Sequence, residues 1–395
     1  MGRDSGHETL RRRGLLLRDK MDKELMRHAV NRAEEHRKYL HTIPEKGLEE
    51  YKTTSYIKEV CKDYQVELID IGMETGAVYW LDAGKSETIG LRADIDALPS
   101  ENGAQHLCGH DSHTATLLGA MDYLCAVKDN LPYNVLFVFQ PAEEGTRGAY
   151  RMLEAGLFEK VPQKPVRMFG IHNRPEVDCG DVVVHKGPLM SEKGIYTITY
   201  SGVAGHASTP HRCIDPIIAA ASFVTGLQTI VSKNVDPFKP VVCTVNSLTA
   251  GDPYIAAPRD AVITGYFRSF DHDTHVRMEE RLRGLAENIA AAYECRCNIE
   301  VIDAVPVLDN PEELYDIAYR AAEAAVGAEH VVDVDPCLAS EDFAMYGKIM
   351  PSFFFWVGSG TPGKKCAPWH DPEFRVDPHY TETAVPVLCA AAITE

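Results

Sequence analysis

The feature that most constrains the fold of this chain is a short apolar run that ends just before two adjacent glutamates. Residues 134–140 read Asn-Val-Leu-Phe-Val-Phe-Gln, without the alternation of polar and apolar residues that marks a half-exposed strand. Such a run is typical of a strand buried on both faces in an α/β sheet. Open α/β sheets place their ligand sites beyond the carboxyl ends of the strands. We therefore expect Glu143 and Glu144, which follow Pro141, to lie at a ligand-binding edge.

A Cys-Gly-His sequence upstream supplies further groups that bind metals. Cys108 and His110 precede an apolar helical stretch, 114–127, so we expect them in the loop that leads into this helix. A helix start beside a cysteine favours the thiolate over the thiol. One thiolate, one imidazole and two carboxylates are ligands that a borderline divalent metal prefers.

The two adjacent glutamates suggest a division of labour. If Glu144 binds a metal, Glu143 stands close to the metal without binding it. A general base needs that position to take a proton from an attacking water. The alternative is a solvated Glu-Glu pair in a loop, and the buried strand and the Cys-Gly-His sequence argue against it.

A change of pattern near residue 190 predicts a second domain inserted into the first. Strands are expected at 195–200, 241–248, 261–270 and 297–302, and helices at 214–231 and 271–293. This β-α-β-β-α-β order is that of a ferredoxin-like domain. The predicted fold is therefore α/β, with a mixed-sheet catalytic domain flanked by helices (1–190 and 304–395) and an inserted α+β ferredoxin-like domain (191–303).

Charge and cysteine content narrow the classes of partner and compartment. A chain of 395 residues is longer than a single hydrophobic core usually accommodates, so two domains are expected. The formal charge of −18 argues against nucleic acid and membrane surfaces as partners. The eleven cysteines are scattered rather than arranged as a disulfide framework, so a cytoplasmic location is expected. Residues 1–20 are charged, and their apolar run 15–17 is too short for a signal sequence, so we expect a poorly ordered extension.

Four motifs stand out along the chain. They are 91–99 (Leu-Arg-Ala-Asp-Ile-Asp-Ala-Leu-Pro), 108–114 (Cys-Gly-His-Asp-Ser-His-Thr), 140–145 (Gln-Pro-Ala-Glu-Glu-Gly) and 205–211 (Gly-His-Ala-Ser-Thr-Pro-His). Together with 41–53 and 369–371 they resemble the M20 metallopeptidase family, and most closely its amidohydrolase branch of aminoacylases, hippurate hydrolases and auxin-conjugate hydrolases. The resemblance implies a metal-dependent hydrolase that cleaves a C–N bond, the amide of an N-acyl or N-aroyl amino acid.

The same resemblance implies a binuclear metal centre. Its five protein ligands would be Cys108, His110, Glu144, His172 and His370. Five ligands exceed a single tetrahedral site, so two divalent ions that share Cys108 fit better. Zinc or manganese is expected, with cobalt and nickel as alternatives. A metal-bridging hydroxide would attack the carbonyl while Glu143 acts as general base. Without the resemblance, a lone histidine such as His172 is more often structural.

The resemblance also assigns residues around the metals. Asp96 and Asp111 are expected to hydrogen-bond to ligands, and a structural salt bridge is the alternative for Asp96. His206 is expected to reach the site of a partner subunit and donate to the oxyanion, which makes residues 191–303 a lid and a homodimer interface. The alternative for His206 is an ordinary loop histidine. Arg268 is expected to bind a substrate carboxylate, or else to be an exposed strand residue.

Two departures from the family pattern leave the reaction open. Ile255 stands where family members usually carry an asparagine that touches substrate, and the link from Pro99 to Cys108 is short. A small-molecule substrate with a carboxylate is still expected, but hydrolytic deamination of an arylamine such as an aminobenzoate is the alternative reaction. A third interpretation is a metal-binding protein without turnover, and the presence of Glu143 argues against it.

Overall fold

The chain forms two compact units. The computed structural model describes residues 21–395 except 102, 146, 207 and 252–256. The first unit comprises Met1–Gly187, Asp309–Asp335 and Asp342–Glu395, and the second comprises Pro188–Leu308 and Pro336–Glu341. The expectations for the extension 1–20 and for Ile255 lie outside the described residues. The functional roles given to the units, catalytic domain and lid or dimerisation domain, stay predictions.

The first unit is built on an eight-stranded mixed sheet in the order β1-β2-β6-β3-β7-β16-β8-β15. Strand β3 runs parallel to β6 and β7, and β7 runs parallel to β16. Every residue of β3 and β6 is buried, as expected for central strands. The strands are β1 (Glu67–Leu68), β2 (Ala77–Leu81), β3 (Thr88–Asp94), β6 (Asn134–Gln140), β7 (Arg167–Asp178), β8 (Val182–Val183), β15 (Val331–Val332) and β16 (Ser352–Gly360).

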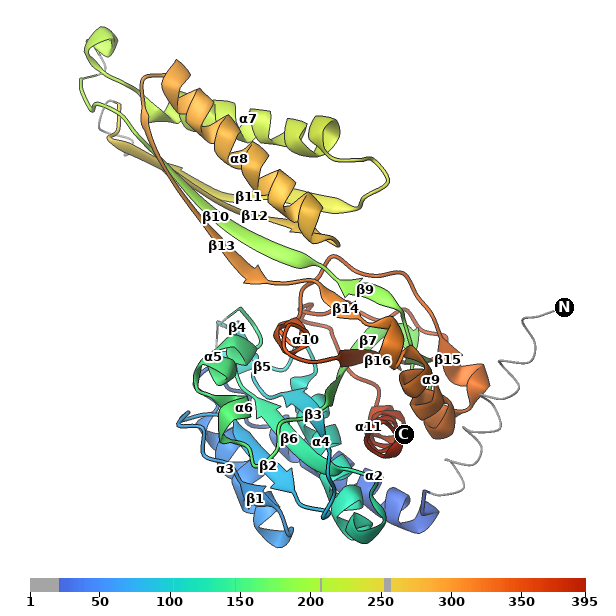
Figure 1. Ribbon diagram of the computed structural model, residues 1–395. Helices are drawn as coiled ribbons and strands as arrows, with labels where there is room; N and C mark the ends of the chain where they lie inside the picture. The colour runs from blue at the N-terminus through green and yellow to red at the C-terminus, as the bar shows by residue number, and fades with distance from the viewer. Residues whose placement is uncertain (1–20, 102, 146, 207, 252–256) are drawn as a thin grey trace, which may run out of the picture. The chain divides into compact units, whose positions relative to one another are not determined.

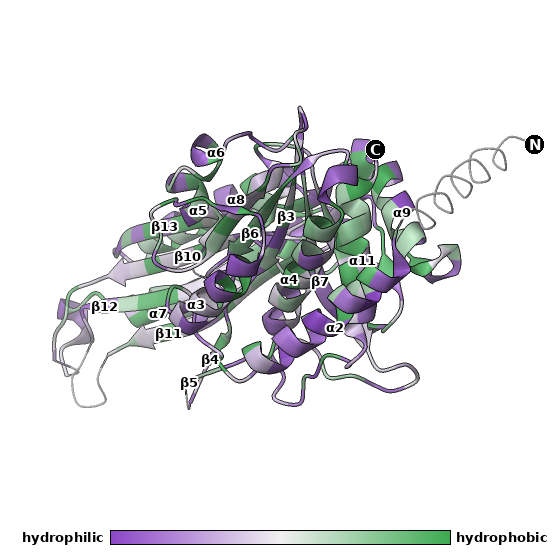
Figure 2. Ribbon diagram, turned by 90° about the horizontal axis from the view of Figure 1, so that it is seen from below, coloured by the Kyte–Doolittle hydropathy of each residue, from purple (hydrophilic) through white to green (hydrophobic). Residues whose placement is uncertain are grey.

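Helices cover both faces of this sheet (Figure 1). Helices α2, α4, α9 and α11 pack together on one face, with α5, α6 and α10 on the other. Figure 2 shows that α11 is mostly apolar whereas α2 is mostly hydrophilic, because α11 is largely buried and α2 is partly exposed. The helices are α2 (Lys23–Leu40), α3 (Tyr51–Val60), α4 (His110–Ala126), α5 (Gly148–Glu154), α6 (Leu157–Lys160), α9 (Glu312–Val326), α10 (Ala344–Gly347) and α11 (Tyr380–Ile393), with the short 3₁₀ helices η1 (Cys61–Asp63), η2 (Lys128–Asn130) and η4 (Ala328–His330).

This architecture confirms the predicted mixed α/β sheet flanked by helices, but the start of one helix differs from the prediction. Helix α4 begins at His110 rather than near residue 114, because Gly109 adopts a left-handed conformation (φ 88°) that turns the chain directly into the helix. Strand β7 extends through His172 to Asp178, because β16 supplies backbone partners along this stretch. His110 therefore lies in a first helical turn, and His172 lies within a strand.

The second unit is a four-stranded antiparallel sheet in the order β11-β12-β10-β13. Its elements follow the expected order: β10 (Glu192–Ser201), η3 (Pro210–Arg212), α7 (Pro216–Asn234), β11 (Val241–Ala250), β12 (Asp260–Ser269), α8 (His272–Ala292) and β13 (Arg296–Val305). Helices α7 and α8 pack against each other and on the sheet. Residues 336–341 also belong to this unit, although the sequence placed them with the C-terminal part of the catalytic domain.

Two short pairs of strands complete the description. Strands β9 (Gly187–Met190) and β14 (Leu308–Asn310) pair where the chain passes between the units, and β4 (Leu98–Ser100) pairs with β5 (Gly103–Gln105) in the short link before Cys108. Among the described residues, no helix is both long and apolar enough to cross a membrane.

Candidate metal centre

Four segments of the first unit converge near the carboxyl ends of β3 and β6. The Sγ atom of Cys108 lies 3.5 Å from Nε2 of His172 on β7. Ligand atoms of Cys108, Glu144 and His370 all lie within 4.8 Å of one another. The backbone N–H of His370 donates to the carbonyl of Leu107 (2.8 Å), which holds the loop before α11 against the Cys-Gly-His corner.

The start of α4 adds an imidazole to the same place. Ligand atoms of His110, Glu143 and Glu144 form another group within 4.8 Å. The structure therefore brings together the five predicted ligands and the predicted general base. Which of these side chains bind metal stays a prediction.

Two buried atoms at the centre of this group make no hydrogen bond to any described residue. They are Nε2 of His110 and Oε1 of Glu144, which lie 3.9 Å apart. Oε1 of Glu144 also lies 3.2 Å from Nε2 of His370 without hydrogen-bond geometry. Buried polar atoms in folded proteins are normally satisfied by a partner. A sulfur, several imidazole nitrogens and a carboxylate that converge on one point fit divalent metal ions of the zinc class.

The protonation of Cys108 depends on its burial and on neighbouring charges as well as on its position before a helix. Burial, together with the carboxylates of Glu144 and Glu143, raises the pKa of the Cys108 thiol well above its ordinary value. In the metal-free protein, desolvation and these carboxylates favour the thiol, against the preference for the thiolate that is expected from the helix start. A bound cation would be needed to hold the thiolate.

Asp96 contacts two of the proposed ligands. Its Oδ1 lies 3.1 Å from Nδ1 of His110, and its Oδ2 accepts the backbone N–H of Glu144 at 2.9 Å. Burial by itself would lower the pKa of His110, but the carboxylates of Asp94, Asp96 and Glu144 raise it to about 10. These contacts would orient the His110 ring and the turn that carries Glu144, which is how residues around a metal commonly act.

Asp111 makes a different contact from the one expected. Its Oδ2 hydrogen-bonds to Nδ1 of His41 at 2.8 Å, and the His41 side chain is exposed. Although Asp111 is buried, His106 and His41 hold the pKa of its carboxyl well below the ordinary value. Among the described residues, no hydrogen bond joins Asp111 to a proposed ligand, because Asp111 lies on the side of α4 that faces α2.

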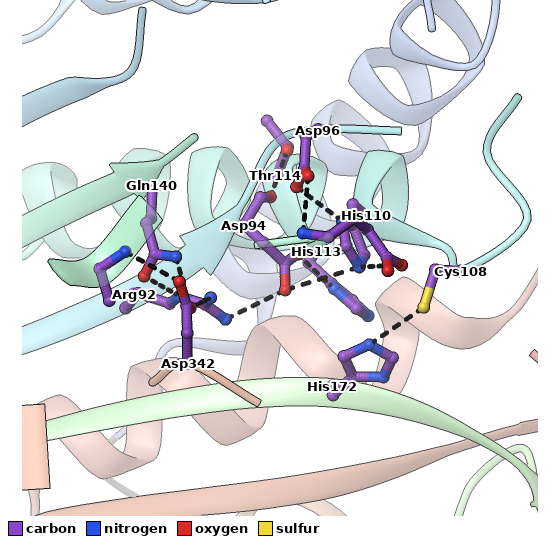
Figure 3. A network of polar contacts seen from close by, with 12 residues as sticks. Arg92, Asp94, Asp96, Cys108, His110, His113, Thr114, Gln140, His172 and Asp342 are labelled. Carbon is purple, nitrogen blue, oxygen red and sulfur yellow. Dashed lines mark hydrogen bonds and ion pairs between the residues drawn. The ribbon is translucent and has the colours of Figure 1, made fainter. Parts of the chain in front are cut away.

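His113 was not singled out in the sequence, although it lies among the proposed ligands. Ligand atoms of Asp94, His110, His113 and His172 fall within 4.8 Å of one another. Both nitrogens of His113 are already used: Nδ1 lies 2.6 Å from Oδ1 of Asp94, and Nε2 accepts the backbone N–H of Asn173 at 2.9 Å. Because the Asn173 N–H can only donate, Nδ1 carries the proton of a neutral ring. His113 is therefore a support for the site rather than a ligand (Figure 3).

A fully buried arginine anchors this support. Arg92 donates from Nη1 to Oδ2 of Asp94 (3.0 Å) and from Nη2 to Oδ1 of Asp342 (3.1 Å). Its Nε donates to Oε1 of Gln140 at 2.9 Å (Figure 3). The sequence held a signal for this network, because Arg92 and Asp94 are charged residues within an otherwise apolar strand and a charge buried there needs a partner.

Two predicted site residues belong to the second unit. His206 is exposed, and its Nδ1 hydrogen-bonds to the hydroxyl of Ser208 at 2.7 Å. Arg268 is partly buried rather than exposed: its Nη1 donates to the carbonyl of Leu338 at 2.6 Å, and its guanidinium lies 4.9 Å from the centre of the Tyr266 ring. The roles of His206 and Arg268 in substrate binding stay predictions.

Comparisons with known proteins identify a matching family and several similar chains. The sequence profile described as peptidase family M20/M25/M40 matches residues 90–393. An N-acetyl-L-cysteine deacetylase of Bacillus subtilis (strain 168) is 36% identical over 362 residues, which cover 88% of this chain and 83% of the relative. The IAA-amino acid hydrolase ILR1-like 4 of Arabidopsis thaliana is 31% identical over 86% of this chain and 80% of its own. The crystal structure of a dinuclear metal-binding M20 peptidase from Bacillus subtilis superposes with a TM-score of 0.76 at 29% identity, covering 94% of this chain and 98% of that chain.

Proposed function

The chain belongs to peptidase family M20/M25/M40 and is a metal-dependent amidohydrolase; from this premise we propose that it hydrolyses the amide of an N-acyl or N-aroyl amino acid. The observation that carries the proposal is the convergence of Cys108, Glu144 and His370 within 4.8 Å at the sheet edge that also carries Glu143. The names of the relatives, a deacetylase of N-acetyl-L-cysteine and a hydrolase of IAA-amino acids, support this substrate class.

The five converging side chains would hold two divalent metal ions, zinc or manganese first, with cobalt and nickel as alternatives. Bound there, such ions supply Lewis acidity toward the amide carbonyl and a water whose pKa is lowered toward neutrality. Cys108 would be one of the residues that hold them, since its sulfur lies 3.5 Å from Nε2 of His172 and within 4.8 Å of ligand atoms of Glu144 and His370. The imidazoles of His110, His172 and His370 and the carboxylate of Glu144 would complete the set.

Glu143 is the proposed general base. It would take a proton from the attacking water and pass it to the departing nitrogen. Its place is set by the residue before it, since Ala142 adopts a left-handed conformation (φ 59°) that is costly for a residue with a Cβ. Glu50 holds this turn by accepting the Ala142 N–H at Oε1 (2.8 Å), and the Gly148 N–H donates to the Ala142 carbonyl (2.9 Å).

For the second unit we propose substrate recognition and dimerisation through residues 191–303. Arg268 would bind the substrate carboxylate, and His206 would donate to the oxyanion in the site of a partner subunit. The exposure of His206 supports this role, because its ring is accessible to a second subunit. Mixing Glu143→Gln subunits with His206→Ala subunits should restore activity if the site crosses the interface. Subunit exchange without recovery would contradict the shared site.

We also propose a cytoplasmic location. All eleven cysteines are unpaired, which agrees with a reducing compartment.

The proposed reaction is tested by turnover of a mixed substrate panel followed by mass spectrometry. The panel contains N-acyl amino acids, hippurate-like amides, dipeptides and aminobenzoates, and the protein is stripped of metal and reloaded with zinc or manganese. We expect metal-dependent release of a free amino acid. Release of ammonia from an aminobenzoate with all amides intact would instead establish arylamine deamination, and no turnover by metal-loaded protein would contradict both reactions.

A further inference from the structure

We infer that Asn173 is a positioning residue that sets the spacing between the chain segments carrying Cys108, His172 and His370. The inference rests on the proposed metal centre and concerns how this chain builds it. Asn173 follows His172 directly on β7, is fully buried and was not singled out in the sequence.

The side-chain amide of Asn173 contacts two of the other ligand-bearing segments. Its Nδ2 donates to the backbone carbonyl of Cys108. Its Oδ1 accepts from the indole Nε1 of Trp369 at 3.1 Å, and Trp369 is the residue before His370. A third partner, the hydroxyl of Ser359 on β16, donates to the same Oδ1 at 3.1 Å. One amide thus ties the cysteine loop and the His370 loop to the strand that carries His172.

The chemistry of these partners leaves the amide only one orientation. An indole N–H can only donate, so the atom that faces Trp369 has to be the oxygen. A backbone carbonyl can only accept, so the atom that faces Cys108 has to be the nitrogen. Among side chains of this size, asparagine offers a donor on one side and an acceptor on the other without having to take up a proton, which favours asparagine at this position.

The backbone of Asn173 adds a connection to the buried support of the site. Its N–H donates to Nε2 of His113, whose Nδ1 is held by Asp94, and Arg92 holds Asp94 in turn. Figure 3 shows the part of this network formed by Arg92, Asp94 and His113, near Cys108 and His172. Because Arg92 lies on β3 and also donates to Asp342, these contacts connect Asn173 to a neighbouring strand and to the segment before α10.

The close approach of the amide explains why a glycine stands between Cys108 and His110. A Cβ on Gly109 would lie 2.5 Å from Nδ2 of Asn173 and 2.9 Å from a methyl carbon of Val376. The left-handed φ of 88° favours glycine at this position as well. The Cys-Gly-His corner is therefore shaped to receive the asparagine side chain.

Loss of the amide should weaken metal binding more than it weakens folding. Without it, the Cys108 carbonyl and the Trp369 indole lose their shared partner, and the two loops can move relative to His172. Residues that orient metal ligands typically account for 10-fold to 100-fold in metal affinity. We expect a loss of this size in Asn173→Leu and in Asn173→Asp. The aspartate keeps the acceptor for Trp369 but turns an acceptor toward the Cys108 carbonyl.

The test is a cobalt(II) titration of the full-length metal-free protein, followed by the thiolate-to-cobalt charge-transfer absorption, with thermal unfolding of the metal-free protein measured in parallel. Asn134 provides the matched control: it is a buried asparagine whose amide bonds to Ala83, Lys85 and Gln163 at the opposite end of β6. Asn134→Leu and Asn134→Asp should lower the unfolding temperature without changing the cobalt affinity.

The outcomes separate the inference from the proposed function. A wild-type protein that binds cobalt with a thiolate band, while both Asn173 variants bind it 10-fold to 100-fold more weakly and the Asn134 variants do not, supports the inference. Asn173 variants that bind cobalt as tightly as the wild type overturn it, even if they unfold at lower temperature. If Asn173→Leu fails to fold, the cobalt affinity of Asn173→Asp alone is compared with that of the wild type, with the same two outcomes. A wild-type protein without any thiolate band would overturn the proposed metal centre, and the inference with it.

Discussion

The two sheets of this protein bury different kinds of side chain. In the first unit, β3 is buried at every position, and this includes the charged residues Arg92 and Asp94. In the second unit, β10 alternates: Tyr196, Ile198 and Tyr200 are buried, while most residues between them are half-buried. The core of the second sheet is apolar and is formed with α7 and α8.

This difference follows from how each sheet is covered. The parallel strands of the first unit have helices on both faces, so a polar residue near a strand end is buried and must find a partner. Hydrogen bonds to those partners fix the orientation of the polar side chains at the strand ends, and a metal site needs ligands with fixed orientations. In the second unit the helices cover one face of the sheet and contact every second residue of a strand. The residues between these core positions can therefore be polar. We therefore expect polar changes in the first unit to affect chemistry and metal binding, and apolar changes in the second to affect stability.

The largest expected effect comes from the proposed base in the first unit. Glu143→Gln should lower kcat by about 10²-fold to 10⁴-fold while metal binding is retained, because the variant cannot accept the proton from the attacking water. Steady-state kinetics on an amide substrate and metal analysis check this. Glu67→Gln, on the exposed strand β1, serves as the control and should keep full activity. Full turnover by Glu143→Gln would show that another group is the base.

The next prediction compares the loss of stability when one arginine is replaced in each unit. Arg92→Met leaves the carboxylates of Asp94 and Asp342 buried without their cation, which should reduce the free energy of unfolding by about 3–5 kcal/mol. The control is Arg283→Met, which removes a partly exposed ion pair with Glu279 and should cost less than about 1 kcal/mol. Urea unfolding followed by tryptophan fluorescence reports on the first unit, where all three tryptophans lie, and circular dichroism in the same titration reports on both units. Equal losses in the two variants would contradict the comparison.

A smaller effect concerns pH and the turn before Glu143. Burial, with the nearby charge of Asp96, raises the pKa of Glu50 from 4.5 to about 7. Because the folded protein holds this proton more tightly than the unfolded chain, Glu50 contributes stability that is fully present below pH 4.5 and is lost as the pH rises through about 7. The contribution is at most roughly 3 kcal/mol.

Urea unfolding of the metal-free protein at a series of pH values checks the Glu50 prediction. The stability of the wild type relative to Glu50→Gln should fall between pH 4.5 and 7, and the glutamine still accepts the Ala142 N–H. Glu49→Gln, the exposed neighbour, should follow the wild type across the whole range. A constant difference between wild type and Glu50→Gln would mean that the carboxyl titrates normally.

The smallest effect is a change in the apolar core of the second unit. Phe267 is fully buried on β12 and packs against His275, with ring centres 4.5 Å apart. Phe267→Leu should cost about 1 kcal/mol in the free energy of unfolding, since the replacement is apolar and similar in size. Circular dichroism during urea unfolding should detect this loss, whereas cobalt affinity should not change. A changed cobalt affinity would show that the two units do not divide stability and metal binding as we infer.

Much of the candidate site could be predicted because its groups are close together in the chain. Cys108 and His110 are separated by one residue, and Glu143 and Glu144 are adjacent. The apolar strand 134–140 then placed the glutamates at a sheet edge by a rule that depends only on strand direction. The boundaries were less well predicted, and α4 starts at His110 because the conformation of Gly109 is decided by its packing against Asn173 and Val376.

The residues that support the site were decided by the tertiary structure. Asn173 bonds to Trp369 across 196 residues, Arg92 to Asp342 across 250, and Glu50 to Ala142 across 92. Such pairs depend on strand register and on how helices close over the sheet, and no local pattern in the chain encodes them. The amino-acid sequence by itself therefore determined which groups can bind a metal, because ligand chemistry belongs to the side chain. Only the folded structure decided how those groups are held, because orientation requires partners from distant parts of the chain.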